Sequence, residues 1–341
     1  MRIAIVGGGL AGCAAAYVLK RAGADVAIYE ASDRLASAAS GNVVGLYNPR
    51  FGAEASPQTE FYARAYQHAL EVIGGVEEVN QHALGSLHLI TDEKKERRFF
   101  KTYKTWKGYG FTDADMRLVD ADEASRIAGV GVDQGALYLP RGGSVSPAAL
   151  CAVYAHGVEV HYNVSAIPQG DVVILAGGAG MIGHPLLAPL DLRSVRGQVS
   201  YIAANAQTRR LKTHVIYGGY VSPEVDGRHV VGASFQRLLS HCDISPADDA
   251  DNLAKLRDAL PDMDAEFDIV DHRAGVRCSA RDYFPVVGHM GGGIYVSLAH
   301  GSHGIVSSIL AAEILVAEIL GLPQKVSDEC VAALSPARLM R

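Results

Sequence analysis

A strand, a glycine-rich turn, a helix and a second strand open the chain, and they constrain the fold more than any other feature. Arg2 to Val6 is a short run rich in Ile and Val, as in a buried parallel strand. Gly7-Gly8-Gly9-Leu10-Ala11-Gly12 follows it directly, and residues 10–21 have the composition of a helix closed by Gly23. Asp25 to Tyr29 predicts the second strand. The sequence therefore predicts a βαβ unit of the dinucleotide-binding type.

Each glycine of this G-x-G-x-x-G motif has a physical role. Gly7 allows the tight turn, Gly9 lets the backbone approach a pyrophosphate, and Gly12 allows the helix to pack closely on the strand. The pyrophosphate then lies at the positive end of the helix, where Leu10 and Ala11 begin it. Glu30, at the end of the second strand, is placed for its carboxylate to bind the ribose hydroxyls of an adenosine, which disfavours NADP.

The rest of the chain predicts an α/β protein interrupted by antiparallel sheet. Helices are expected from Ser56-Pro57, over 92–107 with Thr91 as its cap, from Ser146-Pro147, from Ser245-Pro246, and over 305–320. Strands are expected over 85–90, 136–139 ending at Pro140, 158–162, 171–176 and 293–298. Asp226-Gly227 predicts a hairpin between 218–225 and 228–234.

From this order we expect a Rossmann domain made of residues 1–80, 143–197 and 276–341. Residues 81–142 and 198–275 would form a second, mainly antiparallel α+β domain for the substrate.

Composition excludes several classes of protein. The 341 residues carry a net charge of -6, which argues against a chain that coats itself in nucleic acid or anionic lipid. The five cysteines are scattered and form no C-x-x-C motif, so we expect a reducing cytoplasm and no metal site. The longest uncharged stretch, residues 3–19, contains three consecutive glycines and makes a poor membrane span, so no membrane partner is expected.

Together these motifs resemble the glutathione-reductase-like flavoproteins, and within them the D-amino acid oxidase, glycine oxidase and sarcosine oxidase group. The resemblance implies FAD as cofactor and an FAD-dependent oxidoreductase acting on CH–NH donors. Besides the opening motif, it implies three FAD-binding segments, which are Ser40-Gly41-Asn42, Ala176-Gly177-Gly178 and Gly301-Ser302-His303-Gly304. A positive helix end at the last segment would stabilise negative charge on the reduced flavin, whereas an ordinary loop before a packing helix is the alternative.

A narrower resemblance is to the oxidoreductase domain of the bifunctional MnmC family, which matures the wobble uridine of tRNA. The segments that carry it are 39–42, 196–200, 219–223, 232–234, 275–282 and 334–339. It implies oxidation of the C–N bond in an N-substituted glycine, carboxymethylaminomethyl-uridine or its 2-thio form, with release of glyoxylate. The chain begins at the nucleotide-binding strand, so we expect any methyltransferase partner to be separate. The alternative is an oxidase or dehydrogenase of a small amine or amino acid, such as glycine, sarcosine or a D-amino acid.

Two residues are candidates for holding the substrate. Arg277 matches the carboxylate anchor of the glycine oxidases, and a guanidinium binds a carboxylate through two parallel hydrogen bonds. A structural arginine paired with an acid is the alternative. Tyr220 matches a tyrosine that supports the same carboxylate. Cys278 resembles the cysteine that carries covalent flavin in sarcosine oxidases, although tRNA-modifying relatives with a cysteine here hold dissociable FAD.

A basic segment is a candidate contact for RNA. Residues 94–107 contain seven basic side chains and one acid. On a helix Arg98, Lys101 and Lys104 share a face with Lys94 and Arg97, where they could contact phosphates. The alternative is a solvated helix face that binds nothing.

Overall fold

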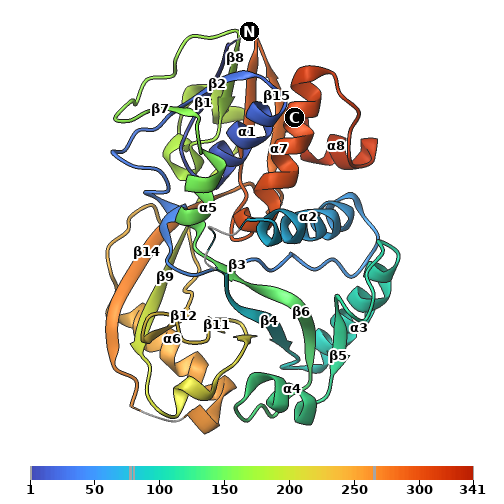
Figure 1. Cartoon of the computed structure of the whole chain (residues 1–341), viewed down its shortest axis with the longest axis vertical. Coiled ribbons are helices and arrows are strands. Elements are labelled where there is room, and N and C mark those ends of the chain that lie inside the picture. The colour runs from blue at the N-terminus through green and yellow to red at the C-terminus, as the bar shows by residue number, and fades with distance from the viewer. Residues whose placement is uncertain (1, 77–78, 80, 264–265, 341) are drawn as a thin grey trace.

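The computed structural model of the chain describes residues 2–76, 79, 81–263 and 266–340. Two sheets divide the molecule, and Figure 1 shows one in its upper half and the other in its lower half. The domain ranges expected from the sequence include residues 1, 77–78, 80, 264–265 and 341, which lie outside the described residues. Their internal boundaries fall within strands that continue through the second sheet, so the division into domains stays a proposal.

The upper sheet confirms the predicted βαβ unit. Its strand order is β15-β16-β8-β1-β2-β7, and every pair is parallel except β15 with β16. β1 is flanked by β2 and β8, so its carboxyl end meets the ends of both neighbours. The strands are β1 (Arg2–Val6), β2 (Asp25–Tyr29), β7 (Glu159–His161), β8 (Val172–Leu175), β15 (Val286–Gly291) and β16 (Ile294–Leu298).

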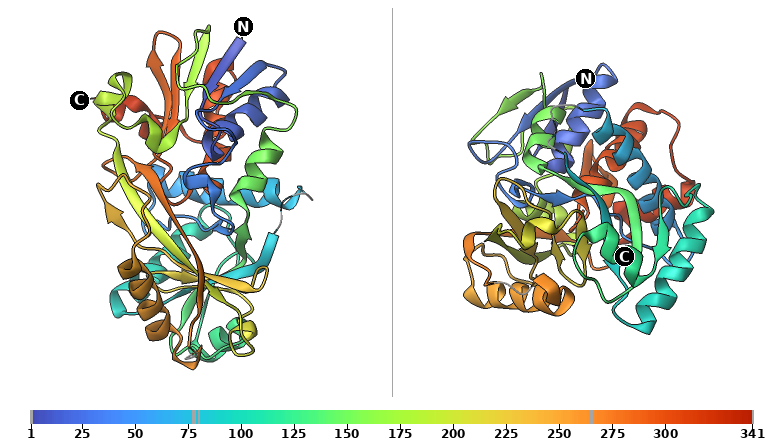
Figure 2. Two further views of the ribbon diagram at one scale, coloured as in Figure 1. Left: turned by 90° about the vertical axis from the view of Figure 1, so that its left-hand side faces the viewer. Right: turned by 60° about the horizontal axis from the view of Figure 1, so that its bottom comes forward.

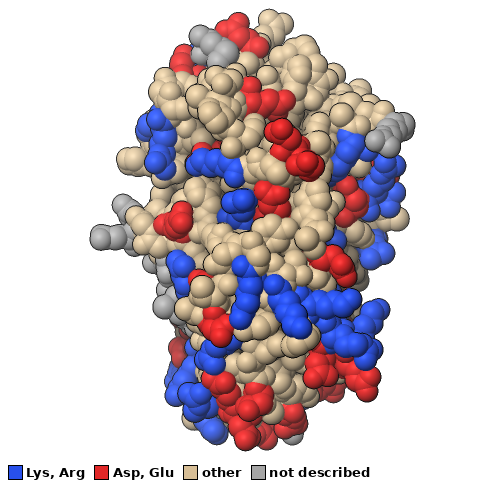
Figure 3. All heavy atoms as spheres, turned by 90° about the vertical axis from the view of Figure 1, so that its right-hand side faces the viewer, with Lys and Arg blue, Asp and Glu red and all other residues tan. Residues whose placement is uncertain are grey.

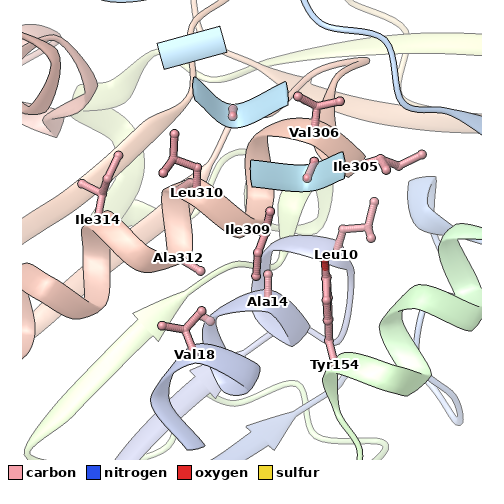
Figure 4. Packing of buried hydrophobic residues seen from close by; sticks show 14 of the residues in the cluster. Leu10, Ala14, Val18, Tyr154, Ile305, Val306, Ile309, Leu310, Ala312 and Ile314 are labelled. Carbon is pink, nitrogen blue, oxygen red and sulfur yellow. The ribbon is translucent and has the colours of Figure 1, made fainter. Parts of the chain in front are cut away.

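An apolar helix layer packs against this sheet. α1 (Leu10–Arg21) lies against α7 (Gly304–Leu320), and α2 (Pro57–Gly74), α5 (Pro147–Tyr154) and α8 (Asp328–Leu334) surround the pair. Figure 4 shows Ala14 and Val18 of α1 facing Ile309 and Ala312 of α7. α1 contributes mainly small side chains, which allow the two helices to approach closely. The start of α1 is therefore fixed by the buried core behind it.

The lower sheet has ten strands and is mainly antiparallel. Its main order is β13-β9-β12-β11-β10-β4-β6-β3, with β14 paired to β9 and β5 to β6; only β10 and β4 are parallel in this sheet as described. Figure 2 shows this sheet from two further sides. The strands are β3 (Gly45–Leu46), β4 (Gln81–Leu89), β5 (Arg117–Val119), β6 (Ala136–Val145), β9 (Arg193–Ala203), β10 (His214–Ile216), β11 (Tyr220–Val221), β12 (Arg228–Gly232), β13 (Gln236–Arg237) and β14 (Ile269–Ser279).

Three details of this half differ from the sequence-based expectations. β6 continues through Pro140 to Val145, because a proline at a sheet position that donates no hydrogen bond does not end a strand. The helix over 92–107 is α3 (Glu93–Lys107), and its cap is Asp92, whose carboxylate accepts from the Lys95 amide at 2.8 Å, not Thr91. The two longest strands, β9 and β14, were not predicted as strands.

The outer helices cover the far face of this sheet. α4 (Ala121–Ala128) and α6 (Pro246–Ala259) pack there on Leu87, Val215 and Val221. Buried polar groups also fasten α6 to β9. Arg196 is ion-paired with Asp248, and Asp249 accepts hydrogen bonds from the Gln198 amide at 2.9 Å and the Ser200 hydroxyl at 2.6 Å. The opposite face of the lower sheet borders the cavity described below.

Candidate active site

A cavity of about 840 Å³ lies where the two sheets meet. The predicted cofactor residues that line it are Gly7, Gly9, Leu10, Ala11, Glu30, Ser40, Asn42, Ala176, Gly177, Gly178, Gly301, Ser302, His303 and Gly304. We call these the glycine-rich wall. Residues of the lower sheet also line the cavity, and we call four of them the side-chain wall: His88, Ile216, Tyr220 and Arg277. The structure thus brings the predicted cofactor residues and the predicted Arg277 and Tyr220 to one space.

The turn after β1 has no room for side chains. Gly7 has a φ of +110°, and a Cβ placed on it would lie 2.6 Å from the Cα of Gly177. A Cβ on Gly12 would lie 1.9 Å from the Gly7 carbonyl oxygen, so Gly12 shapes the turn without itself lining the cavity. The backbone at the ends of β1 and β8 is consequently exposed to the cavity, as a pyrophosphate requires.

Glu30 is held in place by backbone amides. Its two carboxylate oxygens accept hydrogen bonds from the Gly8 amide at 2.6 Å and the Ser32 amide at 2.8 Å. The side chain is 9% exposed and lines the cavity. Each carboxylate oxygen has a further lone pair, so Glu30 can still accept hydrogen bonds from a ribose.

The loop after β2 is tied to both halves of the molecule. Ser40 accepts a hydrogen bond from the Leu10 amide at 3.2 Å, which places the loop over the start of α1. From β14, Arg273 donates to the Ala38 carbonyl at 2.7 Å and to the Asn42 side chain at 3.1 Å. Gly41 does not line the cavity, but a Cβ there would lie 2.3 Å from the Arg273 guanidinium. No local pattern indicates Arg273, because its partners are more than 200 residues away.

The beginning of α7 points its positive end toward the cavity. Gly304 begins the helix and no acidic residue occupies its first turn. His303 donates from Nδ1 to the Asn48 carbonyl at 3.0 Å, since a carbonyl can only accept. Burial lowers the pKa of His303 to about 4, so its ring is neutral at pH 7. The dipole of α7 therefore supplies the positive potential at this end of the cavity.

A second neutral histidine supports the same loop. His300 Nδ1 lies 2.8 Å from the Ser307 hydroxyl, which in turn donates to the His303 carbonyl at 2.9 Å. Ser307 has one hydroxyl hydrogen, so it accepts from the Nδ1–H of His300. Nε2 of His300 then accepts from Ser297 at 3.1 Å. Burial lowers the pKa of His300 to about 4, consistent with this neutral form.

Arg277 is half-buried, and one nitrogen of its guanidinium has no partner in the part of the chain that the structure describes. Its Nη1 is buried and has no hydrogen-bond partner among the described residues. The guanidinium lies over Gly197 of β9, where a Cβ would come within 2.2 Å of Nη1. Burial lowers the pKa of Arg277, and burial also raises the pKa of the neighbouring Tyr220. The cavity thus contains a desolvated cation beside a phenol, which fits a carboxylate ligand.

Cys278 follows Arg277 and also lines the cavity. Its side chain is 6% exposed, and burial raises the pKa of the thiol to about 11. A thiol with a raised pKa is a poor nucleophile at neutral pH.

The basic helix α3 reaches the cavity through one residue. Arg98 lines the cavity, whereas Lys101 and Lys104 do not. Lys101 lies 3.5 Å from Glu54, and Lys104 lies over the Phe100 ring at 4.2 Å. Phe99, Thr102 and Trp106 form the buried face of the helix. In Figure 3 Lys and Arg gather across the lower half of the face on which α3 lies.

No group of three or more His, Cys, Asp or Glu side chains among the described residues could hold a metal ion. No helix in the described part of the chain is long and apolar enough to cross a membrane.

Known sequences match this chain along most of its length. Residues 2–318 match the DAO family, described as FAD dependent oxidoreductase. The chain is 31% identical over 98% of its length to the tRNA 5-methylaminomethyl-2-thiouridine biosynthesis bifunctional protein MnmC of Nitrosospira multiformis. It is 29% identical over 98% of its length to the MnmC of Chromobacterium violaceum. The chain spans 59% of the length of each of these relatives.

Solved structures show the same fold. The glycine oxidase of Geobacillus kaustophilus superposes with a TM-score of 0.83 at 21% identity, over 99% of each chain. The iminodiacetate oxidase of Chelativorans sp. BNC1 superposes with a TM-score of 0.80 at 21% identity, over 98% of this chain and 99% of that one.

Proposed function

Because the chain belongs to the DAO family of FAD-dependent oxidoreductases, we propose that it oxidises the C–N bond of an N-substituted glycine carried on tRNA. The substrate would be carboxymethylaminomethyl-uridine or its 2-thio form. One observation carries this proposal, namely the buried, unpartnered Nη1 of Arg277 at a cavity that fits FAD. The similarity to MnmC proteins supports a role in tRNA modification.

The reaction needs little acid or base chemistry from the protein. FAD, when bound, supplies the acceptor of two electrons. The methylene carbon between the amine and the carboxylate loses a hydride, and the nitrogen lone pair forms the C=N bond of an iminium. Water adds to that carbon, and the C–N bond then breaks to give glyoxylate and the aminomethyl-uridine. That product would be a substrate for a methyltransferase, which we propose as a partner.

The residues of the side-chain wall hold the substrate for this step. Arg277 binds the carboxylate through its unpartnered Nη1, and the Tyr220 hydroxyl donates to the same carboxylate. Both groups are fixed on strands, so the methylene carbon is held in one orientation. Glu30, the turn at Gly7 and the start of α7 would hold FAD on the opposite wall. Positioning therefore accounts for most of the catalysis that this chain supplies.

A small amino acid is the second candidate substrate. Arg277 and Tyr220 can bind the carboxylate of glycine or sarcosine as well as that of a modified uridine. Arg98 at the cavity favours the tRNA substrate, because a cation on an exposed helix can contact phosphate.

The two candidates are separated by the nucleosides of tRNA from a deletion strain. Accumulation of carboxymethylaminomethyl-uridine, measured by mass spectrometry, is the expected result. Unchanged tRNA together with oxidation of free glycine by the purified protein would support the second candidate instead.

The carboxylate anchor is tested by Arg277→Met. Loss of the guanidinium should raise the KM for carboxylate substrates by about 100-fold, since one charge-assisted hydrogen bond contributes about 1.5–3 kcal/mol. Bound FAD, measured by flavin absorbance, should stay at one equivalent because Arg277 does not contact the glycine-rich turn. Arg257→Met, on the outer face of α6, is the matched control. Unchanged kinetics in Arg277→Met would refute the assignment.

A further inference from the structure

The side-chain wall contains a second unpartnered group, at His88. This side chain is 7% exposed and lines the cavity, and its Nε2 has no hydrogen-bond partner among the described residues. Its ring contacts that of Phe51 edge to face, with centroids 4.9 Å apart. Neither the FAD-binding residues nor the carboxylate anchor accounts for this group. A buried, unpartnered polar atom on a side chain that lines a cavity is costly unless a ligand satisfies it.

Strand register places His88 on the same face as the anchor. His88 of β4 pairs with Ile216 of β10, and Ile216 pairs with Tyr220 of β11. Directly paired residues of neighbouring strands point their side chains to the same face of a sheet. The row His88, Ile216, Tyr220 therefore forms a continuous floor, with Arg277 beside Tyr220 at one end.

The length of this row exceeds what a free amino acid needs. Neighbouring strands are about 4.8 Å apart, so the Tyr220 and His88 backbones are separated by roughly 10 Å. Glycine or sarcosine bound to Arg277 would end near Ile216. A carboxymethylaminomethyl group followed by a pyrimidine ring is long enough to bring the polar edge of the ring to His88.

The surroundings of His88 suit a neutral planar ring followed by a phosphate. Burial, together with the nearby charges of Lys95 and Arg98, lowers the pKa of His88 to about 3, so the imidazole is neutral and can pair with a carbonyl or an imide N–H. Phe51 supplies an aromatic side, and it lines the cavity too. Arg98 lines the cavity from α3 and its side chain is exposed. The order along the cavity is thus anion anchor, apolar floor, neutral polar group and cation.

The geometry points to a nucleotide subsite formed by His88 and Arg98, in which His88 pairs with the polar edge of the pyrimidine and Arg98 contacts its phosphate. This inference rests on the proposed function and assigns substrate specificity within it. His88 acts as a specificity residue, because it selects the ring attached to the reacting glycine and takes no part in hydride loss.

Paired substrates test this subsite in the holoenzyme. Carboxymethylaminomethyl-uridine 5′-monophosphate and sarcosine share the reacting group, but only the first has a ring and a phosphate. For His88→Leu, the ratio of kcat/KM for the nucleotide over sarcosine should fall about 10-fold, and uridine 5′-monophosphate measured by calorimetry should bind about 10-fold more weakly. His88→Gln keeps a donor and an acceptor and should recover part of this loss. Arg98→Ala should weaken binding of the nucleotide but not binding of the dephosphorylated nucleoside.

The controls separate this inference from the proposed function. His156→Leu, at an exposed position away from the cavity, should leave both substrates and the binding of uridine 5′-monophosphate unchanged. Flavin absorbance and the melting temperature report whether His88→Leu folds, and Arg98→Ala gives an independent test on an exposed helix. If the nucleotide is oxidised equally well by wild type and His88→Leu, the subsite is wrong and the proposed function stands. If wild type oxidises sarcosine and neither binds nor oxidises the nucleotide, the subsite and the proposed function are both wrong.

Discussion

The two walls of the cavity are built by different means. The glycine-rich wall presents backbone and small residues, because Cβ atoms at Gly7 or Gly12 would overlap neighbouring backbone. The side-chain wall presents an arginine, a tyrosine and a histidine on the strands of a sheet. A diphosphate is bound by backbone amides and a helix end, whereas a carboxylate or a ring is recognised by particular side chains. Substitutions that disturb the glycine-rich wall should therefore abolish cofactor binding. Substitutions in the side-chain wall should change substrate preference.

The largest effect is expected from Gly12→Val. The new side chain would overlap the Gly7 carbonyl oxygen, which a Cβ alone would approach to 1.9 Å. We expect the free energy of unfolding to fall by roughly 3 kcal/mol and bound FAD to be lost. Chemical denaturation and flavin absorbance measure both. Gly74→Ala, where a Cβ meets nothing within 4 Å, is the matched control and should retain FAD. A Gly12→Val protein that is stable and binds FAD would contradict the claim that the glycine-rich wall depends on the absence of side chains.

A pH-dependent effect of intermediate size is expected from His300, which supports the glycine-rich wall through Ser307 and His303. Its pKa is lowered by burial from 6.5 to about 4, so the unfolded chain binds a proton below pH 6.5 that the folded chain does not. The stability that the neutral His300 contributes is complete above pH 6.5 and is lost as the pH falls toward 4. His300 alone should contribute a loss of about 2 kcal/mol between pH 7 and 5.

Two variants measure that contribution through the slope of unfolding free energy against pH. His300→Gln should reduce the slope. Ser307→Ala removes the hydrogen-bond partner of His300 and should lower stability while retaining the slope. Equal slopes in wild type and His300→Gln would show that this histidine is not held neutral.

A smaller effect is expected from Arg273→Ala, which sharpens the comparison because a side chain of the lower sheet supports the glycine-rich wall. Loss of its hydrogen bonds to Ala38 and Asn42 should weaken FAD binding about 5- to 10-fold, corresponding to roughly 1 kcal/mol. The KM at saturating FAD should change little. Fluorescence titration of the apoprotein with FAD measures the affinity, and Arg257→Ala is the control. An unchanged FAD affinity would mean that Ser40 alone, and not Arg273, holds the loop after β2 in place.

Local patterns in the sequence were sufficient for the glycine-rich wall. The strand, turn and helix from Arg2 to Arg21 are contiguous, and their apolar and glycine positions predict both the elements and the motif. Ser146-Pro147 and Ser245-Pro246 also predicted helix starts, because a proline at the first helical position acts within one turn; Ser146 caps its helix, whereas the Ser245 side chain makes no cap hydrogen bond. The resemblance then supplied Arg277 and Tyr220, which the structure brings to the same cavity.

The side-chain wall depended on pairings that no local pattern contains. β9 and β14 contain glycines and charged residues, such as Arg196 and Asp271, whose burial or pairing is settled by distant partners. His88 could have been noticed from β4 itself. Ser86 and His88 alternate there with Leu87 and Leu89, so one face of a buried strand is polar. In this chain the polar face borders the cavity.

The two arginines of β14 link both walls through a single strand. Arg273 and Arg277 are four residues apart in a stretch paired with β9 without interruption, so they project from the same side at a spacing of about 13 Å. Inserting one residue between them would turn one arginine to the opposite side of the sheet. Inserting two would restore its direction but shift it by roughly 7 Å. Homologous proteins that bind both ligands in this way should therefore tolerate changes of sequence between these positions but not changes of length.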